Sequence, residues 1–203
     1  MEYVLNIIEI LAVLTSAYSG IVEAKRNNLD FVGVLTVALV TAFGGGTLRD
    51  ILLDRRPLYW IQNWEFLIYV FILAAVSLVL FRFNKDFSSG LTLLIIDALG
   101  LGLFCASGVG LALAMKTPIF AAALFGVITA TFGGVLRDIL CNQVPKLFQP
   151  TQPLYATCAF TGAWVYIAMY NLGTVRPLGL IVCISVTFLL RVLAVRFNLR
   201  LPF

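Results

Sequence analysis

Long apolar stretches separated by short polar breaks run along the chain from one end to the other. A helix that crosses a bilayer needs about 20 mostly apolar residues, with a range of about 17–25. The breaks contain the charged residues, prolines, glycines and asparagines that end helices. The pattern therefore predicts seven membrane-spanning helices, near Val4–Val22, Phe31–Leu53, Glu65–Phe81, Leu91–Met115, Ile119–Leu140, Pro153–Tyr170 and Leu178–Val195.

Composition supports the same class of protein. Hydrophobic residues make up 61% of the 203 residues and charged residues 12%, whereas a soluble domain carries about 25% charged residues. We therefore expect an all-α integral membrane protein with a single membrane domain over residues 1–203. The first stretch has no basic residues before it and no clear small-residue cleavage site after it, so we expect a retained helix and not a signal peptide.

Basic residues indicate an orientation. If the N-terminus marks the first side, the connections on that side hold four of them: Arg55, Arg56, Lys116 and Arg176. The connections on the second side hold seven: Lys25, Arg26, Arg82, Lys85, Lys146, Arg196 and Arg200. Because short cytoplasmic connections carry the excess of lysine and arginine, we expect the N-terminus outside and the C-terminus in the cytoplasm. These residues flank apolar spans, so membrane lipids are the expected partners and nucleic acid is not.

One motif occurs twice. TAFGGGTLRDIL (Thr41–Leu52) and TATFGGVLRDIL (Thr129–Leu140) agree at nine of twelve positions, and 88 residues separate their arginines. The same offset aligns further pairs: Ser19-Gly20 with Ser107-Gly108, Pro57 with Pro145, and Glu9 with Asp97. A series of matches in one register indicates an internal repeat. We assign repeat one to residues 1–88, repeat two to residues 89–176 and an extra helix to residues 177–203.

The number of spans in each repeat fixes their relation. Each repeat contains three predicted spans, so the second repeat starts from the opposite side of the membrane. The two copies then run antiparallel, which is the inverted-repeat design of many transport proteins. We expect the pathway of such a protein at the interface between the repeats.

The glycines and the charged pair of the motif predict a polar site inside the membrane. Gly44, Gly45 and Gly46 favour a bend or a break in the second span, and Gly133 and Gly134 do so in the fifth. Arginine or aspartate near a helix centre costs about 2.5–3.5 kcal/mol, so both usually face an interior or a polar pathway. The candidate pathway residues are therefore the glycines with Arg49, Asp50, Arg137 and Asp138, and with the neighbouring hydroxyl residues Thr41, Thr129, Ser19 and Ser107.

Structural explanations exist for the same residues. Glycines often only allow membrane helices to approach closely, and Arg49 could extend to the interface. Each aspartate could simply take part in a structural ion pair, and a hydroxyl in a membrane helix more often bonds its own backbone. Glu9 and Asp97 could be solvated helix ends, and Arg191 is most simply an interfacial anchor.

Other site classes have little support. The chain has no histidine, and its four cysteines, Cys105, Cys141, Cys158 and Cys183, form no C-x-x-C pair. We therefore expect no metal site, no disulfide framework and no bound cofactor, and we interpret the cysteines as small buried hydrophobes. Without histidine or a clustered carboxylate site, an enzyme is not expected.

Seven spans, a three-plus-three inverted repeat and the doubled GGxxRD motif resemble the prokaryotic trimeric intracellular cation (TRIC) channels. These belong to a wider set of small bacterial inner-membrane proteins whose duplicated domain is also labelled glycine transporter. The resemblance covers the whole chain. It implies a homotrimer in the plasma (inner) membrane. Each subunit would carry an hourglass-shaped pore formed largely by glycine-bent spans two and five and permeable to monovalent cations, potassium above all and sodium second.

Three further observations leave the function open at this point. Phe132 stands where the first copy has Gly44, so the halves are unequal, and the lysine-and-glutamate motif of the animal members is absent from the second span. Arginine along a cation path would repel the ion, so we expect Arg49 and Arg137 to point sideways, towards carboxylates or freed carbonyls. The same architecture would also suit a carrier for glycine or another small zwitterion, with the ammonium group held by Asp50 or Asp138. A structural membrane protein without a pathway is the remaining alternative.

Overall fold

The computed structural model describes residues 2–83 and 90–200, with side chains over 6–80 and 90–200. These residues form an all-helical protein, as expected. Its elements are α1 (Glu2–Arg26), α2 (Phe31–Leu52), α3 (Tyr59–Gln62), α4 (Glu65–Phe83), α5 (Gly90–Ala114), α6 (Ile119–Leu140), the 3-10 helix η2 (Lys146–Phe148), α7 (Ala156–Asn171) and α8 (Arg176–Arg196).

Five helices of the described residues are long and apolar enough to cross a membrane: α1 from Asn6, α2, α5, α6 and α8. The apolar part of α4 with described side chains is Glu65–Leu80, and α7 has 16 residues. Sixteen residues extend about 24 Å at 1.5 Å per residue, which is less than the roughly 30 Å of a hydrocarbon core. The number of seven spans therefore stays a prediction.

Helix ends agree with the sequence pattern where the pattern contains a local stop signal. The fifth predicted span, Ile119–Leu140, has the bounds of α6, and α2 ends one residue before the predicted Leu53. In contrast, α1 continues a full turn beyond Val22, and α7 begins three residues after Pro153. Side-chain contacts from distant parts of the chain account for both differences, as described below.

The C-terminal ends of α2 and α6 have the same backbone structure. The residue after each cap is left-handed, with φ of 50° at Asp54 and 54° at Asn142. The next amide N–H donates back to the carbonyl of the motif aspartate, from Arg55 to Asp50 and from Gln143 to Asp138, at 2.8 Å in both cases. This 6→1 bond is the Schellman arrangement that ends many helices.

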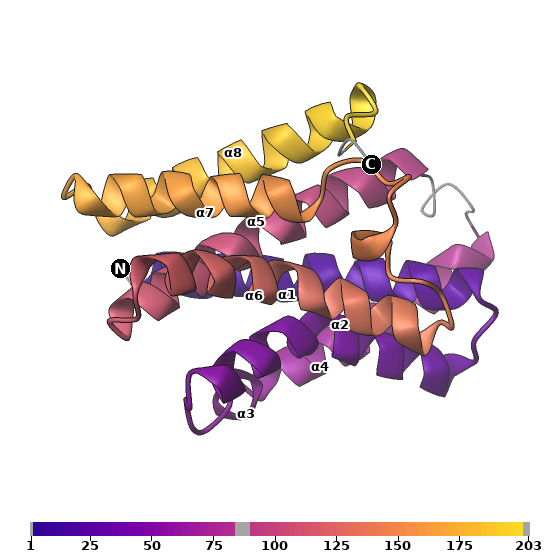
Figure 1. Ribbon diagram of the computed structural model, residues 1–203. Helices are drawn as coiled ribbons and strands as arrows, with labels where there is room; N and C mark the ends of the chain where they lie inside the picture. Colours follow the sequence, from indigo (N-terminus) through magenta and orange to yellow (C-terminus); the bar gives the residue numbers. More distant parts are fainter. Residues whose placement is uncertain (1, 84–89, 201–203) are drawn as a thin grey trace.

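The helices lie side by side in two groups (Figure 1). α4 packs against α1 and α2 on one flank, whereas α7 and α8 pack against α5 on the other, and α2 packs directly against α6. One hydrophobic core lies among α1, α2 and α4, and the second lies mainly among α5, α6, α7 and α8. Phe104 of α5 packs against both cores.

The expected break at the motif glycines does not occur. α2 is helical without interruption through Gly44–Gly46, and α6 through Gly133 and Gly134. A helix tolerates each glycine at a cost of about 1 kcal/mol, and close contact with a neighbouring helix offsets such a cost. A bend without a break stays a prediction.

Candidate functional site

α2 and α6 touch through two of the motif glycines. A Cβ atom on Gly45 would lie less than 3.0 Å from the backbone carbonyl oxygen of Thr129, and a Cβ on Gly133 would lie equally close to the carbonyl oxygen of Thr41. Real Cβ atoms essentially never come so close to backbone. These two positions therefore require glycine because two helix backbones meet there.

The remaining motif glycines have different surroundings. A Cβ on Gly44 would meet the flexible end of the Leu136 side chain at 2.7 Å. At Gly46 and Gly134 the nearest atom outside the local backbone is the guanidinium of Arg49 or Arg137, at 3.8 Å in both cases. Gly46 and Gly134 therefore have room for a methyl group, and at Gly44 only the end of a flexible side chain would have to move, so close backbone packing requires glycine at none of the three.

The motif threonines bond to their own helices. Thr41 Oγ1 donates to the carbonyl of Val37 and Thr129 Oγ1 donates to the carbonyl of Phe125, at 2.6 Å each. This is the common i−4 bond of a hydroxyl in a helix. Both side chains still face the space between the repeats, where their lone pairs remain acceptors.

Each motif arginine binds the aspartate that follows it. Arg49 Nε and Nη2 lie 2.9 and 2.8 Å from Asp50 Oδ1. Arg137 Nε and Nη2 lie 2.9 and 2.7 Å from Asp138 Oδ1. All four residues are buried, so each charge is neutralised at a distance typical of a charge-assisted hydrogen bond.

The second oxygen of each aspartate fixes the next segment of chain. Asp50 Oδ2 accepts from the backbone N–H of Tyr59, the first residue of α3, and Asp138 Oδ2 accepts from that of Lys146, the first residue of η2. Both bonds measure 2.8 Å. Both oxygens of each carboxylate are therefore engaged within the protein, and a role for either in binding an ammonium group or a cation stays a prediction.

The arginines also connect the two repeats. Arg137 Nη1 donates to Ser19 of α1 at 2.6 Å, and Arg49 Nη1 donates to Ser107 of α5 at 3.4 Å. Each arginine thus reaches the serine of the other repeat, and the two contacts are equivalent at the offset of 88 residues. The structure brings together the predicted glycines, threonines, serines, arginines and aspartates at one seam, which we define as the contact between α2 and α6 with the adjoining faces of α1 and α5.

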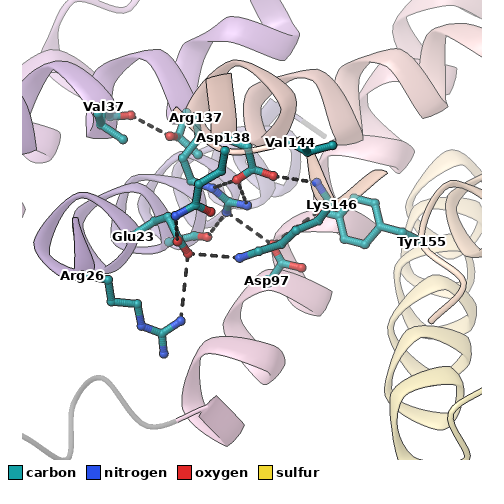
Figure 2. Close-up of polar contacts among 12 residues, drawn as sticks. Glu23, Arg26, Val37, Asp97, Arg137, Asp138, Val144, Lys146 and Tyr155 are labelled. Carbon is teal, nitrogen blue, oxygen red and sulfur yellow. Dashed lines mark hydrogen bonds and ion pairs between the residues drawn. The ribbon is translucent and has the colours of Figure 1, made fainter. Parts of the chain in front are cut away.

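Two acidic residues stand beside the arginines. Asp97 Oδ1 lies 3.9 Å from Arg137 Nη1 and accepts from the Tyr155 hydroxyl at 3.3 Å, as Figure 2 shows. In the other half Glu9 accepts from the Tyr59 hydroxyl. Burial, followed by the charge of Glu9, raises the pKa of Tyr59, so the phenol keeps its proton and donates. The sequence aligns Glu9 with Asp97 but is equally compatible with solvated helix ends, and it gives no signal for the two tyrosines, because they do not align at the repeat offset.

A further ion pair closes the end of the molecule where α1 ends. Glu23 is buried near the end of α1, and its carboxylate lies 3.0 Å from Lys146 Nζ (Figure 2). Gln143 also donates to Glu23, at 3.1 Å. These partners lie 120 and 123 residues further along the chain, so no local sequence pattern predicts the contacts.

Arg191 of α8 has a structural role as well. Its Nη1 donates to the carbonyls of Pro153 and Leu154 at 3.0 Å, and its guanidinium lies 4.7 Å from the ring centroid of Tyr155. The side chain is buried, so it is not the expected interfacial anchor. It instead holds the segment that precedes α7 and thereby fixes where that helix begins.

Three cavities follow the seam. The largest of these three, about 220 Å³, opens where α1 and α8 end and α5 begins, and its walls include Asp97, Arg137 and Arg191. A larger hollow of about 530 Å³ lies against α2, Trp60 and Leu136, but no charged residue lines it. A central cavity of about 20 Å³ lies between the two motifs. It is lined by Thr41 and Thr129, by Arg137 with its partners Ser19 and Asp97, and by other residues of α1, α5 and α6. A third, also about 20 Å³, lies near Glu9, Arg49 and Ser107 at the opposite end.

Within residues 2–83 and 90–200 no three His, Cys, Asp or Glu residues are grouped as a metal site. The four cysteines are free and buried. They behave as the small hydrophobes that their sequence positions indicated.

A family model described as glycine transporter matches the chain twice, over residues 6–83 and 94–171. The two matches are displaced by 88 residues, the same offset as the two motifs. Among curated relatives, a UPF0126 membrane protein of Vibrio cholerae is 33% identical, covering 98% of this chain and 82% of the relative. The UPF0126 inner membrane protein YadS of Escherichia coli K12 is 32% identical, covering 96% and 93%.

Solved structures extend the likeness to channels. A chain from a study of conductance through TRIC cation channels is 34% identical, with a TM-score of 0.88, covering 98% of this chain and 96% of that one. The TRIC channel orthologue from Rhodobacter sphaeroides is 30% identical, with a TM-score of 0.87, covering 97% and 99%. These relatives are membrane proteins and channels and not enzymes. The chain therefore belongs to the prokaryotic TRIC channel family, within the duplicated bacterial membrane proteins that the glycine transporter model describes.

Proposed function

We propose that this chain is a channel for monovalent cations, permeable to potassium first and to sodium second, with one pathway in each subunit along the seam. The observation that carries the proposal is the row of three cavities between the repeats, with the carboxylate of Glu9 at one end and that of Asp97 where the other two cavities meet. The structural relatives named above are described as cation channels, which supports the same activity here.

The contacts at the seam support an inverted repeat. Thr41 faces Gly133 while Gly45 faces Thr129, so the contact moves up one helix as it moves down the other. Helices related by a two-fold axis parallel to them would instead pair equivalent positions, Thr41 with Thr129. We therefore infer that the two repeats run in opposite directions, with repeat one over residues 1–88, repeat two over 89–176 and an extra helix over 177–203.

The ion would be stabilised by side chains and not by freed backbone carbonyls, because both helices are unbroken. Carboxylates and hydroxyl oxygens can replace lost hydration. Asp97 is the best-placed carboxylate, with 21% of its side chain exposed to the cavity system. Arg49 and Arg137 are already paired with aspartate, so their charge does not repel the ion in full.

The proposed assembly is a homotrimer in the plasma (inner) membrane, with lipids around its apolar faces. The N-terminus would lie outside and the C-terminus in the cytoplasm, as the excess of basic residues favours. In this orientation the 220 Å³ cavity opens to the cytoplasm, and the cavity beside Glu9 lies towards the outside.

Purified protein in planar bilayers under a potassium chloride gradient tests this function. The expected result is unitary current that reverses near the potassium equilibrium potential. Saturable glycine uptake with counterflow and without unitary current would favour the carrier and contradict the channel.

A pair of variants sharpens the test. Asp97→Asn should lower potassium conductance because it removes the charge at the cavity wall. Asp54→Asn removes a charge from an exposed residue that lines none of the three cavities, and it should leave conductance unchanged. Equal effects of the two variants would contradict a pathway along the seam.

A further inference from the structure

The three cavities along the seam are not equally connected. Among the described residues, the central cavity and the 220 Å³ cavity share five lining residues: Ser19, Asp97, Gly134, Arg137 and Tyr155. The central cavity and the cavity beside Glu9 share a single one, Phe104. The two junctions therefore differ: four of the five residues at the first carry polar side chains, whereas the one residue that lines both cavities at the second is aromatic.

The surroundings of Phe104 make this junction apolar. Its partly buried ring packs against both hydrophobic cores. Among the described residues, no other partly buried side chain contacts both cores. Phe43 and Trp60, whose ring centroids lie 6.5 Å apart, line the same cavity. A hydrophobic constriction excludes water and can block ions without closing completely.

The repeat comparison explains why only one end has this feature. At the offset of 88 residues Phe104 corresponds to Ser16, and Phe43 corresponds to Thr131. Ser16 also lines the central cavity, and Thr131 lines the 220 Å³ cavity. Two aromatic rings beside the Glu9 cavity thus correspond to two small hydroxyl residues towards the opposite end of the seam.

We propose that Phe104 is the hydrophobic barrier of the pathway, which keeps the central cavity in contact with the C-terminal end of the molecule and separates it from the N-terminal end. The barrier therefore lies off centre, in the half that contains Glu9. This inference deepens the proposed channel function, because it names the residue that limits ion passage and the side from which the seam is reached.

The test uses Ser16→Cys as a reporter in the central cavity and silver ion as the probe. Silver is a thiol-reactive monovalent cation, and the four native cysteines are buried, so the chain without the reporter gives the background. Protein is reconstituted in vesicles, and protease cleavage of a C-terminal tag reports which end faces outward. Thiols that silver has blocked are counted by alkylation after unfolding and mass spectrometry.

The expected result is one-sided reaction. Silver added at the C-terminal end blocks the reporter rapidly, whereas silver added at the N-terminal end reacts at least about tenfold more slowly, because the apolar constriction excludes the ion. Adding Phe104→Ser should raise the slow rate by about tenfold and leave the fast rate unchanged. The control Phe104→Leu keeps an apolar side chain and should raise the slow rate much less.

Equal rates from both ends in the chain that retains Phe104 would overturn the barrier, and this comparison does not depend on the folding of any Phe104 variant. Equal acceleration by Phe104→Ser and Phe104→Leu would overturn it as well. The bilayer recording is separate: one-sided reaction without potassium current would retain the barrier and contradict the channel. Potassium current with equal silver reaction rates from both ends would retain the channel and contradict the barrier.

Discussion

Replacing Gly45 by alanine tests the close crossing of α2 and α6. The added methyl would lie less than 3.0 Å from the Thr129 carbonyl oxygen, whereas ordinary contact begins at 3.4 Å. The two backbones must therefore separate by at least 0.4 Å, and no flexible side chain can absorb the change. Overpacking of this kind typically costs about 1–3 kcal/mol.

The neighbouring Gly46 supplies a matched control. A methyl there would have its nearest neighbour at 3.8 Å, at the guanidinium of Arg49. Alanine is favoured over glycine in a helix by about 1 kcal/mol, and this gain applies to both substitutions. The difference in free energy of unfolding between Gly45→Ala and Gly46→Ala therefore isolates the steric cost, and we expect it to be about 1–3 kcal/mol.

Unfolding of the purified protein in mixed detergent micelles, followed by circular dichroism, measures this difference. Gly133→Ala and Gly134→Ala should repeat the result in the second half. The double variant Gly45→Ala/Gly133→Ala should cost less than the sum of the single variants, because both widen the same crossing. Equal stability of Gly45→Ala and Gly46→Ala would refute the view that the crossing requires glycine.

Three further substitutions can be measured in the same unfolding assay. Asp138→Asn should lower stability by about 3–5 kcal/mol because it leaves the buried Arg137 without its carboxylate, and a loss below that of Asp54→Asn would contradict the ion pair. Lys146→Met should cost about 1 kcal/mol or less, since 38% of that side chain is exposed and Arg26 and Gln143 still contact Glu23; a larger loss would contradict a solvent-screened pair. Arg191→Met should cost about 2 kcal/mol through its two lost hydrogen bonds and should speed amide exchange at the start of α7; unchanged exchange there would argue against its role.

The sequence predicts most helix ends because the signals are local. Pro118 precedes α6, the Asp30 side chain accepts a hydrogen bond from Gly33 N–H at the start of α2, and a left-handed residue follows each motif. The sequence pattern places the end of α1 at Val22, four residues too early, because charged residues usually mark the end of a span. Glu23 nevertheless stays inside the helix, since Lys146 neutralises it from a distant segment.

The sequence predicts which residues form the site but not which contacts they make. Thirteen residues named from the motif and its surroundings do meet at one seam. The sequence could not show that Gly45 and Gly133 serve contact between helices, because a glycine in a helix is compatible both with a bend and with close packing. It also could not show that Asp50 and Asp138 are occupied by backbone amides, since those amides lie 8 or 9 residues away in irregular segments.

The crossing at Gly45 and Gly133 bears on how the two halves can change over time. If a chain of half this length formed the same crossing with an inverted copy of itself, one mutation would alter both contacts at once. When both halves belong to one chain, a mutation in one half leaves the sequence of the other half unchanged. In this chain the two equivalent positions already differ, since Phe104 carries an aromatic ring where Ser16 carries a hydroxyl. The two ends of the seam can therefore have different properties although the crossing between them is symmetric.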